Sequence, residues 1–121
     1  MQAVREDMLL VDIKEFVYQR KFNSFPVVDA SGKLKGILSL SDCQEALEKG
    51  DMSVTALDIA TRKVVYVTGE EAILAALNKI TSGDFAILPV VDSKDSMKLL
   101  GVISRRDIIS AFNEYFMKRM H

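Results

Sequence analysis

The residues of this chain with the clearest chemical potential stand together at Ser104-Arg105-Arg106-Asp107. An aliphatic run ends at Ile103 and a helical pattern begins near Arg105, so this segment is predicted to join a strand to a helix. A helix N-terminus offers unpaired N–H groups and partial positive charge, and two arginines beside it add cationic donors, which together favour phosphate. The two carboxylate oxygens of Asp107 can accept hydrogen bonds from both hydroxyls of a ribose.

This junction occurs twice in the chain. Its earlier copy runs from Gly36 to Asp42, and a Pro-Val-Val-Asp strand precedes each copy. The prolines, Pro26 and Pro89, stand 63 residues apart, while the closing aspartates, Asp42 and Asp107, stand 65 apart. A period of this length in only two copies excludes a long solenoid and predicts two similar half-domains packed on each other.

Hydrophobic periodicity predicts the order strand, helix, strand, strand, helix in each half. In the first half the expected elements are a helix at residues 11–19, strands at 27–28 and 34–40, and a helix from Ser41 that ends before Gly50. For this last helix, Ser41 is the expected N-cap and Gln44 its capping-box partner. In the second half we expect strands at 64–68, 85–92 and 99–103, a helical face of Ile73, Leu74, Leu77 and Ile80, and a final helix from about Arg105.

The predicted fold class is therefore mixed α/β (α+β), with two pseudo-symmetric β-α-β-β-α units. The expected boundaries are residues 1–50 for the first unit, 51–60 for a linker and 61–121 for the second unit. A half of about 60 residues buries a core poorly by itself, so the two apolar faces are expected to pack into one compact module.

The composition excludes several function classes. Sixteen basic and seventeen acidic residues give a net charge of −1, so nucleic acid is not an expected partner. Cys43 and His121 are the only cysteine and histidine, which excludes an internal disulfide and a protein-only zinc site. The sequence has no apolar run long enough to insert in a membrane, and a cytoplasmic location is expected. Without a histidine dyad, metal cluster or Walker-type loop, no enzymatic activity is expected.

The two repeated motifs resemble the cystathionine-β-synthase (CBS) domain, and two in tandem resemble a CBS pair, or Bateman module. The resemblance implies a pseudo-twofold disc that forms a homodimer, binds an adenosyl ligand such as AMP, ADP, ATP or S-adenosylmethionine, and regulates an attached enzyme, channel or transporter. Asp58-Ile59-Ala60-Thr61 and the run from Arg106 to Asn113 look like the cytoplasmic CBS pair of some ClC-type chloride channels and transporters. The preferred parent is therefore a membrane channel or transporter.

By the family pattern, the end of the second unit faces the helix-strand turn of the first and forms a main cleft. Phe22 can stack on a purine there, while Asn23 hydrogen-bonds the purine edge and Asp107 matches the ribose-binding aspartate of the family. A Thr or Ser that some family members use at the opening of the unit falls near Met1 in this chain. The predicted main cleft consists of Phe22, Asn23, Ser24, Pro26, Ser104, Arg105, Arg106 and Asp107.

The pseudo-symmetric second cleft has Leu40-Ser41 where the main cleft has Arg105-Arg106, so weaker polyphosphate binding is expected there. Its predicted members are Ser39, Ser41, Asp42, Thr61, Val65, Phe85, Ala86, Ile87 and Pro89.

Simpler interpretations of the same residues stay open. Asp42 and Asp107 can be helix-start carboxylates that bind nothing, and Phe22 and Phe85 can be core residues. Cys43 is interpreted as a packed small residue and not as a nucleophile. The alternative function is a structural dimerisation module whose clefts hold no ligand.

Overall fold

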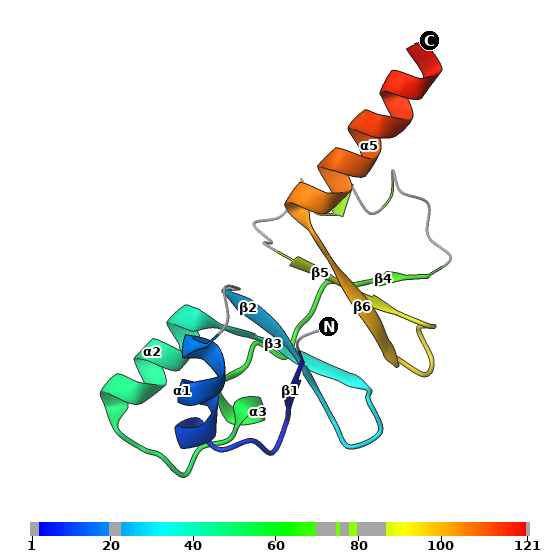
Figure 1. Ribbon diagram of the computed structural model, residues 1–121. Coiled ribbons are helices and arrows are strands. Elements are labelled where there is room, and N and C mark those ends of the chain that lie inside the picture. The colour runs from blue at the N-terminus through cyan, green and yellow to red at the C-terminus, as the bar shows by residue number, and fades with distance from the viewer. Residues whose placement is uncertain (1–2, 20–22, 70–74, 76–77, 80–86, 121) are drawn as a thin grey trace.

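Two three-stranded sheets form the framework of the protein (Figure 1). The computed structural model describes residues 3–19, 23–69, 75, 78–79 and 87–120. Along the chain these residues form β1 (Val4–Arg5), α1 (Leu10–Tyr18), β2 (Ser24–Val28), β3 (Leu34–Ser39), α2 (Leu40–Lys49), α3 (Ala56–Ile59), β4 (Val67–Thr68), β5 (Ile87–Val91), β6 (Leu99–Ser104) and α5 (Arg105–Met120).

Strand pairing is the same in the two sheets. The strand order is β1-β2-β3 in one sheet and β4-β5-β6 in the other, with a parallel first pair and an antiparallel second pair. Even the register irregularity recurs, between Val27 and Val28 in β2 and between Val90 and Val91 in β5. The mixed α/β class and the two-unit organisation predicted from the repeat are therefore confirmed.

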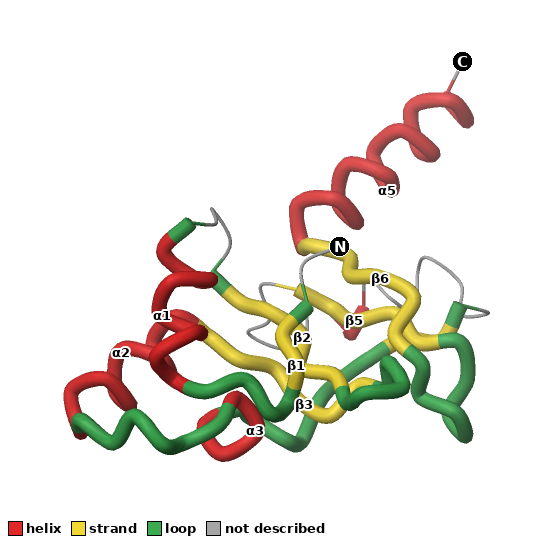
Figure 2. The backbone as a smooth tube through the Cα atoms, turned by 60° about the horizontal axis from the view of Figure 1, so that its bottom comes forward, coloured by secondary structure: helices red, strands yellow, loops and turns green. Residues whose placement is uncertain are grey.

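The first unit has its own apolar core between the sheet and the helices. Ile13 and Val17 lie four residues apart on α1 and are buried with Phe25 and Leu38 of the sheet. The ring of Phe25 meets that of Phe16 edge to face, with centroids 5.3 Å apart. Figure 2 shows α1, α2 and α3 grouped at this sheet, whereas α5 extends away from both sheets.

The start of α2 differs from the prediction. Ser39, and not Ser41, is the N-cap, and the capping-box partner is Asp42, not Gln44. The backbone of Ser39 is still extended at the end of β3, so its Oγ accepts from the Asp42 N–H at 3.1 Å while Asp42 Oδ2 accepts from the Ser39 N–H at 3.2 Å. The predicted end is confirmed, because Gly50 terminates the helix in the left-handed conformation.

The prediction of a strand over residues 64–68 is only partly correct, because β4 contains Val67 and Thr68 alone. Upstream of it, Thr61 pairs with the outer edge of β3 through two 2.9 Å hydrogen bonds to Ile37. Thr61, which the predicted boundary assigns to the second unit, thus pairs with the sheet of the first unit. The helical face of Ile73, Leu74, Leu77 and Ile80 lies outside the described residues, and other element bounds shift by a few residues.

The two units meet where the β2–β3 and β5–β6 hairpins touch. The Leu34 N–H donates to the Met97 carbonyl at 2.9 Å, and the Leu99 N–H donates to the Gly32 carbonyl at 3.0 Å. Since each donor and each acceptor has its repeat equivalent 65 residues away, the exchange is pseudo-twofold symmetric. Leu34 and Leu99 are also buried together with Val91 in a second apolar cluster. Backbone pairing and apolar burial therefore join the halves at the same place.

Both hairpin turns depend on an aspartate. Asp29 Oδ1 accepts from the Lys33 N–H at 3.0 Å, and Asp92 Oδ1 accepts from the Lys98 N–H at 3.0 Å. Hydrogen bonds from a serine hydroxyl, Ser31 Oγ to Asp29 and Ser96 Oγ to Asp92, are the main cause that lowers the pKa of each carboxyl below its ordinary value. The two turns are therefore held by the same pattern of hydrogen bonds to an aspartate, although the second turn is two residues longer.

The close approach of Thr61 to β3 yields a test of the fold. A Cβ added at Gly36 would lie 2.8 Å from the Thr61 carbonyl oxygen, whereas one added at the equivalent Gly101 meets nothing within 4 Å. We expect Gly36→Ala to lower the free energy of unfolding by about 1–3 kcal/mol, because the backbone of residues 60–61 must move. Urea unfolding measures the loss, and Gly101→Ala is the matched control with no loss expected. Equal stability of the two variants would contradict the pairing of Thr61 with β3.

Candidate functional site

The strand-to-helix junction predicted at Ser104 is present. Ser104 ends β6, and its Oγ accepts from the Asp107 N–H at 3.0 Å, so it caps α5. Arg105, Arg106 and Asp107 form the first turn of α5 and are all exposed. Two guanidinium groups and one carboxylate are thus presented to solvent at a helix N-terminus.

The equivalent junction of the first unit uses its aspartate differently. Asp42 is half-buried, and its carboxylate accepts the Ser39 N–H in the capping box. Thr55 and Asp58 form a second box of this kind at the start of α3. By contrast, within the described part of the chain no hydrogen bond donor reaches the carboxylate of Asp107. The two motif aspartates therefore differ in how much of their acceptor capacity is already used.

Residues from both predicted clefts line one cavity of about 340 Å³ at the start of α2. It contains Asn23 and Ser24 of the predicted main cleft together with Ser39 and Ser41 of the predicted second cleft. They meet because β2 and β3 are antiparallel, which pairs Ser24 with Ser39. Leu40 and Gln44 also line this cavity but were not predicted as site residues. Their spacing of four residues, which places them on one face of a helix, could have indicated that they line the same surface.

Other predicted residues are placed as follows. Pro26 and Pro89 are buried inside β2 and β5, so their rings are not exposed at a surface cleft. Ile87 is half-buried and pairs with Ser104 in the second sheet. Phe22, Phe85 and Ala86 lie outside the described residues.

Two lysines of the second unit that were not predicted as site residues line a cavity beside the segment that leads into this unit. Val65 of the predicted second cleft is 37% exposed and lines a cavity of about 360 Å³ that Lys79 and Lys94 also line. The ammonium of Lys79 donates to the Tyr66 carbonyl at 3.0 Å. Lys94 lies in the β5–β6 turn, which is two residues longer than the β2–β3 turn. This extra length could have drawn attention to Lys94 in the sequence.

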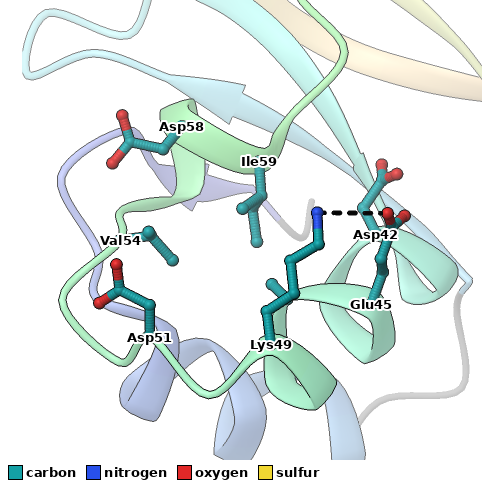
Figure 3. Close-up of a pocket in the computed structure, with 8 residues that line it drawn as sticks. Asp42, Glu45, Lys49, Asp51, Val54, Asp58 and Ile59 are labelled. Carbon is teal, nitrogen blue, oxygen red and sulfur yellow. Dashed lines mark ion pairs between the residues drawn. The ribbon is translucent and has the colours of Figure 1, made fainter.

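The groove beside Asp42 is acidic. It lies between α2 and α3, has a volume of about 360 Å³, and is lined by Asp42, Glu45, Ala46, Lys49, Asp51, Val54, Asp58 and Ile59. Figure 3 shows the Lys49 ammonium reaching Glu45 beside Asp42, at an N–O distance of 3.5 Å. Hydrogen bonds from Ser53 and Thr55, respectively, lower the pKa of Asp51 and of Asp58. Among the described residues, no three potential metal ligands converge.

Cys43 lies in the buried core of the first unit, at 2% exposure. Burial, with a smaller contribution from the neighbouring Asp42 charge, raises the pKa of its thiol to about 11. Since the thiolate is the nucleophilic form, this environment supports the interpretation of Cys43 as a packing residue.

Two repeated sheet-helix units that meet about a pseudo-twofold axis define a tandem α/β module. The family model described as "CBS domain" matches residues 1–49 and again residues 56–114. The chain therefore belongs to the CBS-domain family, and its two units form a Bateman module.

Individual proteins show the same similarity. The magnesium transporter MgtE of Thermus thermophilus is 29% identical over 98% of this chain, which spans 26% of the transporter. The solved cytosolic domain of the Mg²⁺ channel MgtE in complex with ATP is 30% identical, with a TM-score of 0.75 over 91% of this chain and 44% of that one. CBSX2 in complex with AMP gives 22% identity and a TM-score of 0.79 over 95% of this chain and 89% of that one, which shows a shared fold. Within the described residues, no helix has the length and apolar character needed to span a membrane.

The environment of Cys43 predicts slow alkylation of the folded protein. With a thiol pKa of about 11 against the ordinary 9.0, the thiolate population at pH 8 is about 100-fold lower than in the unfolded chain. Because the thiol pKa is higher in the folded protein than in the unfolded chain, burial of the neutral thiol favours folding below pH 9. This contribution to the free energy of unfolding is lost as the pH rises toward 11. Iodoacetamide labelling followed by mass spectrometry, with and without urea, measures the ratio. Equal labelling rates in the two conditions would contradict the buried placement.

Proposed function

We propose that this chain is a regulatory module that binds an adenine nucleotide, AMP, ADP or ATP, between its two CBS units. It requires no cofactor and catalyses no reaction itself. The solved relatives of known ligand support this class of ligand, because one is a complex with AMP and another with ATP. The first unit comprises residues 1–50, the linker residues 51–60 and the second unit residues 61–121 in this proposal.

The observation that carries the proposal is the different state of the two motif aspartates. The Asp42 carboxylate accepts a backbone N–H of its own capping box, whereas the carboxylate of Asp107 accepts no hydrogen bond from a described residue. An exposed carboxylate with both oxygens available suits a ligand that carries two adjacent hydroxyls. Asp107 is accordingly the ribose-binding residue of the main cleft.

The phosphates of the nucleotide lie against the first turn of α5 in this proposal. Arg105 and Arg106 are exposed there, next to backbone N–H groups at the positive end of the helix dipole. Asn23 and Ser24 of the first unit, together with Phe22, supply the base pocket, with Pro26 holding the strand beneath it. This pairing across the units is a prediction from the family pattern.

The second cleft binds polyphosphate more weakly. It has Leu40-Ser41 in place of the two arginines, and its aspartate is engaged in a capping box. Lys79 and Lys94 line a cavity near Val65, so the cationic groups of this side lie in the second unit.

A nucleotide that contacts both units favours one arrangement of them over others, and only a difference in affinity between arrangements can transmit a signal. We propose that the receiver is an attached membrane channel or transporter, with this module on the cytosolic side as a homodimer. Similarity to the magnesium transporter MgtE supports a transport protein as parent. The likeness of residues 58–61 and 106–113 to ClC-type chloride channels makes a chloride channel the specific form of this hypothesis.

Calorimetric titration with AMP, ADP and ATP tests the proposal. One site is expected in the wild type. Asp107→Ala is expected to raise the Kd at least about tenfold, because hydrogen bonds to an ionised group are lost. The stability cost is small, since the side chain of Asp107 takes no part in the helix cap.

Asp42→Ala is the matched control. It removes the equivalent motif residue and is expected to lower stability by about 1 kcal/mol through the lost cap while leaving the nucleotide Kd unchanged. Loss of binding in Asp42→Ala with binding kept in Asp107→Ala would reverse the assignment of the clefts. If the dimeric wild type binds none of the nucleotides, the structural dimerisation module replaces this proposal. The capping role of Asp42, which explains that residue without a ligand, is the observation that favours this alternative.

A further inference from the structure

Two lysines stand directly opposite each other where the units meet. Lys33 and Lys98 are partners in an isolated antiparallel bridge, flanked by the hydrogen bonds from Leu34 to Met97 and from Leu99 to Gly32. This pattern makes them a non-hydrogen-bonded pair, the closer of the two antiparallel pairings, with Cα atoms about 4.5 Å apart. Their side chains therefore leave the same face of the pairing from adjacent positions.

A third exposed lysine, Lys35, stands two residues from Lys33 along the chain. Lys35 is the extra residue at the register irregularity of β3, between Leu34, which pairs with Val28, and Gly36, which pairs with Val27. All three lysines are exposed, and none forms an ion pair with a described residue. Two opposed positive charges from different units, with a third at Lys35 two residues away, thus lie where the units meet.

The carboxylates of the two hairpin turns, Asp29 and Asp92, compensate this charge only in part. The oxygen Oδ1 of Asp29 accepts the backbone N–H of Lys33, and Oδ1 of Asp92 accepts that of Lys98, so both are held in the turns by the main chain. Serine groups supply the other donors to the same oxygens. Lys35 lies near enough to lower the pKa of Asp29, although as the weakest of its causes. Like charges placed opposite each other in a sheet are destabilising, and here the backbone pairing imposes that placement.

We propose that Lys33, Lys35 and Lys98 bind a multiply charged phosphate anion at the junction of the two units. Ammonium groups donate charge-assisted hydrogen bonds to phosphate oxygens, and one such anion relieves the repulsion within the opposed pair. Because the lysines belong to both units, the bound anion ties the β2–β3 hairpin to the β5–β6 hairpin.

This anion site is separate from the proposed nucleoside contacts. Lys33 and Ser39 are six residues apart on one extended strand, as are Lys98 and Ser104, which corresponds to about 20 Å. The single phosphate of AMP bound at Asp107 cannot span that distance. The anion is either a free oligophosphate or the phosphate chain of a second nucleotide, and these two sources share the same chemistry.

Titration of the intact chain with sodium tripolyphosphate tests the inference, with ATP, AMP and adenosine as parallel arms. Saturable binding of tripolyphosphate and a rise in Tm are expected for the wild type. Lys33→Met and Lys98→Met are each expected to raise the Kd for tripolyphosphate at least about tenfold, because a hydrogen bond to an ionised group is lost. Lys14→Met is the matched control, since Lys14 is an exposed lysine on α1 and its removal changes the net charge equally. If ATP competes with tripolyphosphate while adenosine does not, the phosphate chain of a nucleotide also occupies the site.

A second readout needs no ligand. In low salt, Lys33→Met and Lys98→Met are expected to have a higher Tm than Lys14→Met, because only they relieve the opposed charges. Absence of saturable tripolyphosphate binding, or an equal loss of binding in all three variants, would overturn the inference. Its failure is distinguishable from failure of the proposed function, because AMP binding depends on Asp107 and not on these lysines.

Discussion

The backbone exchange between the two hairpins is the interaction on which the rest of the structure depends. Each half has about 60 residues and buries only a small core, so packing against the other half adds to its stability. The reciprocal hydrogen bonds at Lys33 and Lys98 bring Leu34, Val91 and Leu99 into a shared apolar cluster. Thr61 adds a second link, since it pairs with β3 before the chain enters its own sheet. Any ligand site between the units inherits its geometry from these contacts.

The same joint concentrates positive charge. Antiparallel pairing fixes which residues face each other, and in this chain the facing residues are both lysines. Repulsion between the two lysines destabilises a joint that has only a structural role, whereas it favours the binding of an anion between them. The proposed nucleotide site and the proposed anion site both connect side chains of the first unit to side chains of the second. Each site therefore depends on how the two units are joined.

The repeated Ser-x-x-Asp motif has two roles that compete for one carboxylate. At α2 the serine and aspartate complete a reciprocal capping box, so the motif is explained by helix stability. At α5 the serine still caps the helix, but the carboxylate remains available to solvent. Identical spacing therefore does not imply identical function, and the difference between the clefts comes from local hydrogen bonding as well as from the arginine pair.

Much of the fold could be predicted from the sequence because its signals are local or repeated. The aliphatic run from Leu34 to Leu40 marks β3, and the 63-residue offset of Pro26 and Pro89 reveals the two units. The N-cap of α2 was mispredicted because Ser39 and Ser41 are both plausible caps, and only the extent of β3 decides between them. The strand predicted at residues 64–68 is shorter in the structure, Val67–Thr68, because β-propensity does not show which residues of an apolar run find a partner strand.

The sequence alone therefore determined the family, the two-unit organisation and the residue types at each strand-to-helix junction, because these depend on spacing and composition. Only the tertiary structure decided that Lys33 opposes Lys98 and that Ser24 shares a cavity with Ser39. It also decided that the carboxylate of Asp42, and not that of Asp107, accepts a hydrogen bond from a described residue. Those relations depend on strand register and on which backbone group a side chain reaches, and both are set by the packing of segments distant in the chain.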